Sequence, residues 1–129
     1  MSARSPEELD RLFMDALNAG NLDALTALYE PHATLAAQPG RMVRGQAAVR
    51  ETLARILASK PKISLTNKIV GQTGDIALST ARWRLTRLSP AGERVEATGD
   101  SVEVARRQPD GTWLFVIDSP WGLEWDQTA

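Results

Sequence analysis

Two aspartates near the C-terminal end of the chain are the residues best placed to do chemistry. Asp100 and Asp118 lie on either side of the turn Gln108-Pro109-Asp110-Gly111, and the residues between them alternate as strands do. Proline and glycine in this order favour a three-residue loop with a bulge, which predicts that Gln108 opposes Thr112. Counting back from the turn places both aspartates on one mostly apolar face. The other side chains predicted on that face are Val102, Val104, Leu114 and Val116.

A carboxyl pair on such a face suits acid and base catalysis. The count pairs Val102 with Asp118 and Asp100 with Pro120, so the two carboxylates are diagonal neighbours about 7–8 Å apart. Desolvation in an apolar concavity raises the pKa of a carboxyl group toward neutral pH, which favours proton transfer. We predict Asp118 as base or acid and protonated Asp100 as hydrogen-bond donor to an oxyanion. The alternative is that both accept structural hydrogen bonds from backbone amides or tryptophan indoles.

Three helices in the first half of the chain are expected to support this hairpin. The first has a capping signature at Ser5-Pro6-Glu7-Glu8 and ends at Gly20, and the second begins at an asparagine cap and stops before Pro31. The predicted helices cover residues 6–19, 21 to about 29, and 46–59, and a short strand covers 33–37.

Beyond residue 62 the pattern changes to strands, predicted at 63–70 and 76–88 and in the hairpin. Helices followed by an antiparallel meander indicate an α+β fold, with three N-terminal helices packed on one face of a curved, mainly antiparallel sheet. A chain of 129 residues suits a single domain, with an ordered core at about 5–122, that can enclose a small pocket.

Composition excludes several classes of function. The formal net charge of -1 offers no basic field for nucleic acid, and no segment reaches membrane-spanning length. The chain has no cysteine and one histidine, which argues against a thiol nucleophile and against a zinc or haem site. We therefore expect no metal or organic cofactor, no nucleic acid or membrane partner, and, since no signal peptide is found, a cytoplasmic protein.

Several short motifs follow one another in a characteristic order. They are Gly20-Asn21-Leu22-Asp23-Ala24-Leu25, Leu28-Tyr29, His32-Ala33-Thr34, Gly45-Gln46-Ala47-Ala48-Val49-Arg50 and Asp110-Gly111-Thr112-Trp113. This order resembles the NTF2-like superfamily and is most similar to its SnoaL-like, ketosteroid isomerase-like (DUF4440-type) branch. The resemblance covers about residues 6–121 and implies a cone-shaped α+β half-barrel around an apolar pocket, commonly in a homodimer.

The isomerase residues implied by this resemblance are only partly present. The oxyanion-binding tyrosine of the isomerases falls on Phe13 and the general base near Ala37 or Gln38, whereas the second oxyanion-hole acid falls on Asp100. Without the base and the tyrosine, ordinary ketosteroid isomerisation is not expected. We expect either a cofactor-independent isomerase, cyclase or hydrolase acting on a small apolar molecule, or a non-catalytic ligand-binding or dimerisation module of the same fold.

The neighbour of Asp100 on the preceding strand depends on one turn. A four-residue loop at 89–92 places Trp83 on the Asp100 face. A three-residue loop at 90–92 instead places Arg82 opposite Asp100, in a pair that resembles the Asp, Arg and Asp site of limonene epoxide hydrolases. Burial of an unpaired arginine is costly, which favours the first register.

His32, which follows the second predicted helix, is a further candidate because histidine exchanges protons near neutral pH. Beside Asp118 it would form a relay, and otherwise it would fix a loop by hydrogen bonding. Core packing is likewise the alternative for each large side chain that we predict to bind an apolar ligand. The predicted ligand-binding residues are Phe13, Tyr29, Met42, Trp83 and Trp121.

The opposite face of the hairpin carries Trp113, Phe115 and Ile117. If helices cover the aspartate face, these side chains lie outside, and an exposed apolar patch of this size usually marks association. We therefore predict a homodimer formed through this face of the sheet.

Overall fold

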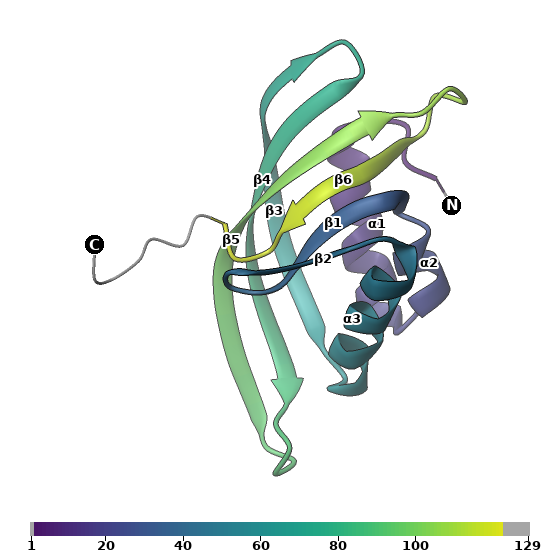
Figure 1. Ribbon diagram of the computed structural model, residues 1–129. Helices are drawn as coiled ribbons and strands as arrows, with labels where there is room; N and C mark the ends of the chain where they lie inside the picture. The colour runs from purple at the N-terminus through teal and green to yellow at the C-terminus, as the bar shows by residue number, and fades with distance from the viewer. Residues whose placement is uncertain (1, 123–129) are drawn as a thin grey trace.

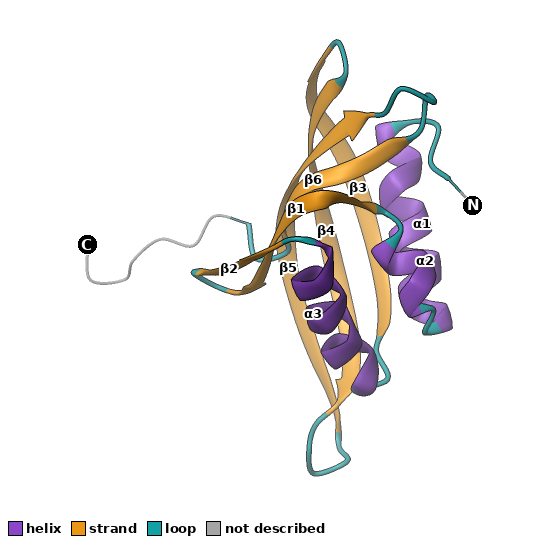
Figure 2. Ribbon diagram, turned by 45° about the vertical axis from the view of Figure 1, so that its right-hand side comes forward, coloured by secondary structure: helices purple, strands orange, loops and turns teal. Residues whose placement is uncertain are grey.

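Three helices cover one face of a curved six-stranded sheet in residues 2–122, the part of the chain that the computed structural model describes (Figure 1). The view in Figure 2 shows that all three helices lie on the same side of the sheet. This confirms the predicted α+β architecture. The elements are α1 (Pro6–Ala19), α2 (Leu22–Thr26), β1 (Tyr29–Gln38), β2 (Arg41–Arg44), α3 (Gln46–Ala58), β3 (Lys62–Thr73), β4 (Ile76–Leu88), β5 (Arg94–Arg107) and β6 (Trp113–Ser119).

Local signals set the first two helix starts. Oγ of Ser5 accepts a hydrogen bond of 3.2 Å from the backbone N–H of Glu8, and Gly20 ends α1 in the left-handed conformation with φ of 68°. The side chain of Asn21 then caps α2. The predicted end of this helix near Tyr29 is wrong, because Tyr29 pairs with Phe115 of β6 and belongs to β1. Pairing with a distant strand therefore overrides local helix propensity.

The strands are ordered β2-β1-β6-β5-β4-β3, so β6, the last of the six described strands along the chain, lies in the middle of the sheet. Neighbouring strands are antiparallel except for β1 and β6, which are parallel. The pairing of β1 with β6 shifts between Tyr29 and Thr34, a stretch that contains Pro31. Such an irregularity suits proline, which has no N–H to donate to a ladder. The strand predicted at 33–37 is longer than expected, because β1 begins at Tyr29 and ends at Gln38.

A β-bulge in β6 changes the predicted register of the hairpin. The backbone N–H of Gln108 donates to the carbonyl of Thr112 at 2.7 Å, as the turn predicts. Ala105 also opposes Phe115 as predicted, but Val104 then opposes Ile117, so Val116 is the extra residue. Because one extra residue reverses the alternation of side chains, every later residue of β6 moves to the opposite face.

The bulge corrects two predictions. Asp118 opposes Glu103, and the predicted pairs of Asp118 with Val102 and of Asp100 with Pro120 are wrong. The predicted exposed patch is also wrong in part, because Trp113 and Phe115 are only 3% and 2% exposed and lie in the core, whereas Ile117 is 43% exposed. Phe115 packs against the rings of Phe13 and Tyr29, with centroid distances of 6.2 and 5.1 Å.

The turn between β4 and β5 adopts the three-residue loop at 90–92, so the four-residue loop favoured from the sequence is wrong. The backbone N–H of Ser89 donates to the carbonyl of Glu93 at 2.7 Å, so Arg82 opposes Asp100. Both side chains nevertheless lie on the outer face of the sheet, away from the helices. Trp83 faces inward and opposes Gly99.

Among residues 2–122, no helix combines the length and the apolar character needed to span a membrane.

Gly99 leaves the space that the indole of Trp83 occupies. A Cβ atom at position 99 would lie 2.6 Å from Cζ2 of Trp83, well inside van der Waals contact. We expect Gly99→Ala to lower the free energy of unfolding by about 1–3 kcal/mol because the core becomes overpacked. Urea denaturation measures this change. Gly71→Ala is the matched control, since a Cβ there meets nothing within 4 Å; equal losses in the two variants would contradict the prediction.

Candidate functional site

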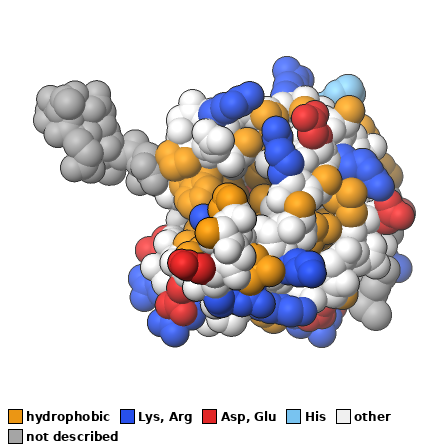
Figure 3. Space-filling model, turned by 90° about the horizontal axis from the view of Figure 1, so that it is seen from below, with side chains coloured by type: hydrophobic (Ala, Val, Ile, Leu, Met, Phe, Trp, Pro, Cys, Tyr) orange, Lys and Arg blue, Asp and Glu red, His pale blue; other side chains and the backbone are white. Residues whose placement is uncertain are grey.

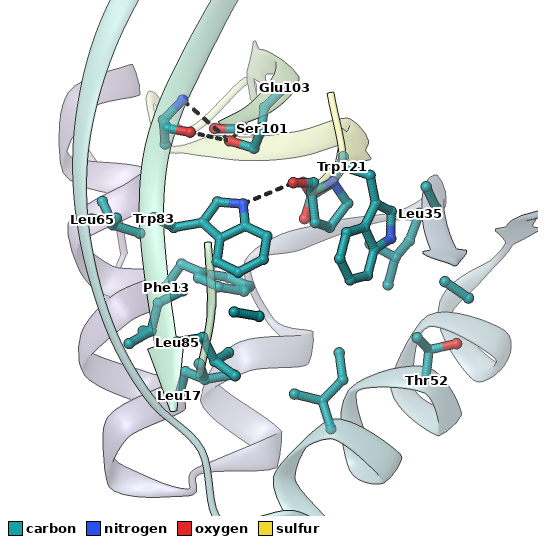
Figure 4. A pocket seen from close by; sticks show the side chains of 18 of the residues that line it. Phe13, Leu17, Leu35, Thr52, Leu65, Trp83, Leu85, Ser101, Glu103 and Trp121 are labelled. Carbon is teal, nitrogen blue, oxygen red and sulfur yellow. Dashed lines mark hydrogen bonds between the residues drawn. The ribbon is translucent and has the colours of Figure 1, made fainter. Parts of the chain in front are cut away.

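A cavity of about 630 Å³ lies between the helices and the concave face of the sheet. Its wall is mostly apolar and includes Phe13, Leu17, Leu35, Leu65, Trp83 and Leu85 (Figure 4). The indole N–H of Trp83 donates to the carbonyl of Pro120 at 2.8 Å, and the ring packs edge-on against Trp121. These contacts place the segment after β6 in the cavity wall.

Three carboxyl groups also belong to this wall. Asp10 comes from α1, Glu103 from β5 and Asp118 from β6, and these residues are 4%, 2% and 5% exposed. Asp10 faces the cavity because Phe13 and Leu17, three and seven residues later, lie on the same helix face. Glu103 and Asp118 are directly opposed across two strands, a relation that places Cβ atoms about 4.5–5.5 Å apart. The cavity is therefore apolar with one acidic region.

Asp118 is held by a tyrosine. The hydroxyl of Tyr29 donates to Oδ2 of Asp118 at 2.5 Å, and both side chains are buried. Burial raises the pKa of Asp118 to about 7, although the hydrogen bond from Tyr29 opposes this shift and the charge of Asp10 adds to it. Asp118 thus exchanges its proton near neutral pH.

Glu103 is held by serine hydroxyls. Oγ of Ser101 hydrogen-bonds Oε2 of Glu103 (Figure 4). Oγ of Ser79 lies 3.4 Å from Oε1 of Glu103. Burial, together with the negative charges of Asp10 and Asp118, raises the pKa of Glu103 to about 10. Glu103 is therefore a neutral acid at pH 7, and it can donate a hydrogen bond that a carboxylate cannot.

Two buried polar atoms in the cavity wall have no hydrogen-bond partner within residues 2–122. They are Oδ2 of Asp10 and Nε1 of Trp121. Burial also raises the pKa of Asp10. Buried polar atoms in proteins are nearly always paired, so Nε1 of Trp121 offers a donor to a molecule in the cavity. The carboxyl group of Asp10 instead interacts with Glu103, whose pKa a side-chain hydrogen bond to Asp10 raises further.

The predicted site residues divide into two groups. Phe13, Trp83 and Trp121 line the cavity, and Tyr29 contacts it through Asp118. The predicted placement of Asp100 beside Asp118 is wrong: Asp100 is exposed on the outer face, where Nε of Arg82 lies 3.0 Å from its Oδ1. The bulge at Val116 is the cause, because it turns Asp118 inward while Asp100 stays outside.

His32 and Met42 also lie away from the cavity. His32 is an exposed residue of β1, so the predicted relay with Asp118 does not form, and Met42 is exposed on β2. The prediction for His32 rests on its position after the second helix, but β1 begins earlier than expected and His32 is exposed on it. The prediction for Met42 rests on its large apolar side chain, but on β2 this side chain is 50% exposed.

The sequence prediction missed Asp10 and Glu103. Asp10 carries a signal that could have found it, since its spacing to Phe13 and Leu17 puts a carboxyl group on an otherwise apolar helix face. Glu103 carries no such signal, because Val102 and Val104 on either side look like the inward residues of the strand. Within residues 2–122, no group of three or more His, Cys, Asp or Glu side chains has a geometry that could hold a metal ion.

The protonation of Glu103 makes stability depend on pH. Its pKa rises from 4.5 to about 10 on folding, so the free energy of unfolding falls as pH rises through this interval. The limiting slope is about 1.4 kcal/mol per pH unit. We expect Glu103→Gln to remove this slope, so that the variant gains stability relative to the wild type from about pH 8 to about pH 9.5, above the titration of Asp118.

Chemical denaturation across this pH range checks the prediction. Glu93→Gln, in the exposed turn between β4 and β5, is the control and should follow the wild type. If the free energy of unfolding changes with pH in the same way for the wild type and Glu103→Gln, Glu103 is ionised in the folded protein.

Comparison with known proteins agrees with the fold. The family profile of the SnoaL-like domain matches residues 11–118. An NTF2-like superfamily protein from Salmonella enterica superposes with a TM-score of 0.79 at 16% identity, covering 94% of this chain and 91% of that protein.

A ketosteroid isomerase-like protein from Erwinia carotovora superposes with a TM-score of 0.77 at 19% identity, covering 88% of this chain and 89% of that protein. No curated protein matches the chain in sequence. At these identities the solved structures show the fold alone, and the profile match over most of the chain shows the family. The chain therefore belongs to the SnoaL-like family, and its fold is that of the NTF2-like proteins it superposes on.

Proposed function

We propose that this protein is an acid–base enzyme that uses its own carboxyl groups to move a proton on a small, mostly apolar carbonyl compound. The observation that carries the proposal is the acidic region of the cavity, where Asp118 and Glu103 face each other with widely separated pKa values. Two groups whose surroundings push their pKa values apart supply a base and an acid at the same pH.

The geometry supports a two-step proton transfer. Asp118, partly ionised at neutral pH, accepts a proton from the carbon beside the carbonyl group, and the electron pair moves to the carbonyl oxygen. Protonated Glu103 donates a hydrogen bond to this oxyanion, an interaction that gains strength in a dry cavity. Asp118 then returns the proton to the same carbon or to another, which gives exchange or isomerisation. Tyr29 positions the carboxyl group of Asp118 through its hydrogen bond.

The alternative is a module that binds a ligand without transforming it. Carboxyl groups held by backbone amides or indoles would favour this alternative. The hydrogen bonds found for Asp118 and Glu103 come instead from the hydroxyls of Tyr29, Ser79 and Ser101, and the Trp83 indole donates to a backbone carbonyl. Hydroxyl partners can reorient when a proton moves, so the hydrogen bonding favours the enzyme.

Proton exchange at carbon tests the proposal without knowledge of the natural substrate. A panel of hydrophobic ketones and enones is incubated with the protein in D2O, and deuterium incorporation beside the carbonyl is followed by NMR. We expect Asp118→Asn to lower the exchange rate at least about tenfold, a typical share for one acid–base group. The wild-type rate should rise with pH through about 7, because the base form of Asp118 increases there.

Asp100→Asn is the matched control, because Asp100 lies on the outer face and should leave the rate unchanged. Glu103→Gln, which keeps a hydrogen-bond donor, should lose less activity than Glu103→Leu. Exchange rates that stay unchanged in both Asp118→Asn and Glu103→Leu would overturn the proposal of an acid–base enzyme. The ligand-binding module would then be the remaining interpretation.

We also propose a homodimer, formed through the outer face of the sheet, which includes Ile117 but not the buried Trp113 and Phe115 of the interface first predicted. Leu78, Val104 and Ile117 lie in register across β4, β5 and β6, and Leu78 and Ile117 are 38% and 43% exposed. Aligned apolar side chains on a solvent-facing sheet favour burial against a second copy.

Sedimentation at micromolar concentration checks the oligomeric state. The wild type should sediment as a dimer, and the double variant Leu78→Lys with Ile117→Lys as a folded monomer. A monomeric wild type would refute this interface.

A further inference from the structure

Three arginines form the exposed charged part of the cavity lining. Arg41 begins β2, Arg55 belongs to α3 and Arg87 lies near the end of β4. All three are exposed residues that nevertheless line the same cavity. Figure 3 shows the molecule from below, where hydrophobic side chains gather in a hollow and Lys and Arg side chains lie around it.

Regular structure aims two of these arginines at the cavity. Along β4 the inward residues alternate, so Arg87 follows Trp83 and Leu85 on the concave face. On α3 the cavity-facing residues are Thr52, Arg55, Ile56 and Ser59, which follow the spacing of one helix face. Arg55 and Arg87 therefore occupy positions on α3 and β4 where the periodicity of the apolar wall would otherwise place an apolar residue.

Charge is segregated within the cavity lining. The acidic members, Asp10, Glu103 and Asp118, are all buried, whereas the basic members are all exposed. The chain as a whole has 15 basic and 16 acidic residues, so this positive group does not reflect a generally basic protein.

These arginines are also poorly neutralised by the protein itself. Within residues 2–122, Arg41 and Arg87 make no ion pair, and Nη1 of Arg55 lies 3.8 Å from Oε1 of Glu51, at the limit of an ion pair. By contrast, Arg82 and Arg84 on the outer face are each paired with an acid. The cavity arginines are thus available to a ligand.

We infer that the molecule bound in this cavity is amphipathic, with an apolar body inside and one anionic oxygen group, a carboxylate or a phosphate, held by Arg41, Arg55 and Arg87. Guanidinium groups match both kinds of anion in geometry and charge. A volume of about 630 Å³ is in the range of sites for small organic ligands.

The segregation also orients the ligand. An anionic group directed inward would meet the acidic region, so it is favoured at the arginines. The opposite end of the ligand, which carries the carbonyl group of the proposed function, then reaches Asp118 and Glu103. That this molecule is a substrate rests on the proposed function. That it binds in the cavity is independent of the proposed function.

Calorimetric titration of the full chain with four matched probes tests the inference. The probes are decanoate, decyl phosphate, decan-1-ol and decyltrimethylammonium, which share one apolar chain and differ in the head group. We expect at least one anion to bind about tenfold or more tightly than the alcohol, and the cation to bind most weakly. The tighter of the two anions identifies the head group.

Arg41→Gln combined with Arg87→Gln should lower the affinity for that anion at least about tenfold and leave decan-1-ol binding unchanged. Retained alcohol binding shows that the cavity of the variant is intact. Arg82→Gln combined with Arg84→Gln, on the outer face, is the matched control and should alter neither affinity. Increasing salt should weaken anion binding alone.

The inference is overturned if neither anion binds better than decan-1-ol, or if the cavity arginine variant binds the preferred anion as the wild type does. The proposed function fails separately, when the Asp118→Asn and Glu103→Leu variants both catalyse deuterium exchange at the wild-type rate. Anion binding that survives such a result would identify the cavity as a binding site without proton transfer.

Discussion

The extra residue in β6 is the constraint on which the rest of the site depends. Trp113 and Phe115 face inward by ordinary alternation, and a regular strand would then point Asp118 toward solvent. Because Val116 is bulged, two core aromatics and a carboxyl group all enter the same interior. The acidic region, the hydrogen bond from Tyr29 and the opposition of Glu103 and Asp118 follow from this one irregularity. Bulges often redirect side chains next to active sites, and here the redirected group is the proposed base, Asp118.

Burial of three carboxyl groups in an apolar cavity opposes folding. Hydroxyl donors from Tyr29, Ser79 and Ser101 offset part of the desolvation, and protonation of Glu103 offsets a further part. Hydrophobic residues of similar size would fill the same positions at lower cost, so fold stability alone does not explain the cluster. Proteins accept such local conflicts mainly where function requires them.

The sequence was informative where structure is decided locally. The cap at Ser5, the left-handed glycine at 20 and the Pro-Asp-Gly turn predict the bounds of α1 and the start of the hairpin, because each acts through neighbouring backbone groups. The end of α2 and the bulge at Val116 depend on pairing with strands far away in sequence, which no local pattern encodes. The residues of the candidate site divide in the same way into those that local patterns predict and those that distant strand pairing decides. Cavity residues on α1 and β4 follow from helical and strand periodicity, whereas the partner of Asp118 depends on a register that only tertiary contacts decide.

The place of β6 in the sheet also determines when the site can form. This strand is the last one in residues 2–122, yet it lies between β1 and β5 and joins two halves of the sheet that are not otherwise paired there. During synthesis the edges of β1 and β5 that pair with β6 therefore stay unpaired until residues 113–119 leave the ribosome. Pairing of β1 with β6 closes a loop of most of the chain, a slow kind of contact in folding. Asp118 and Tyr29 meet only in this final step, so an incompletely folded protein lacks the hydrogen bond that positions Asp118 in the candidate site.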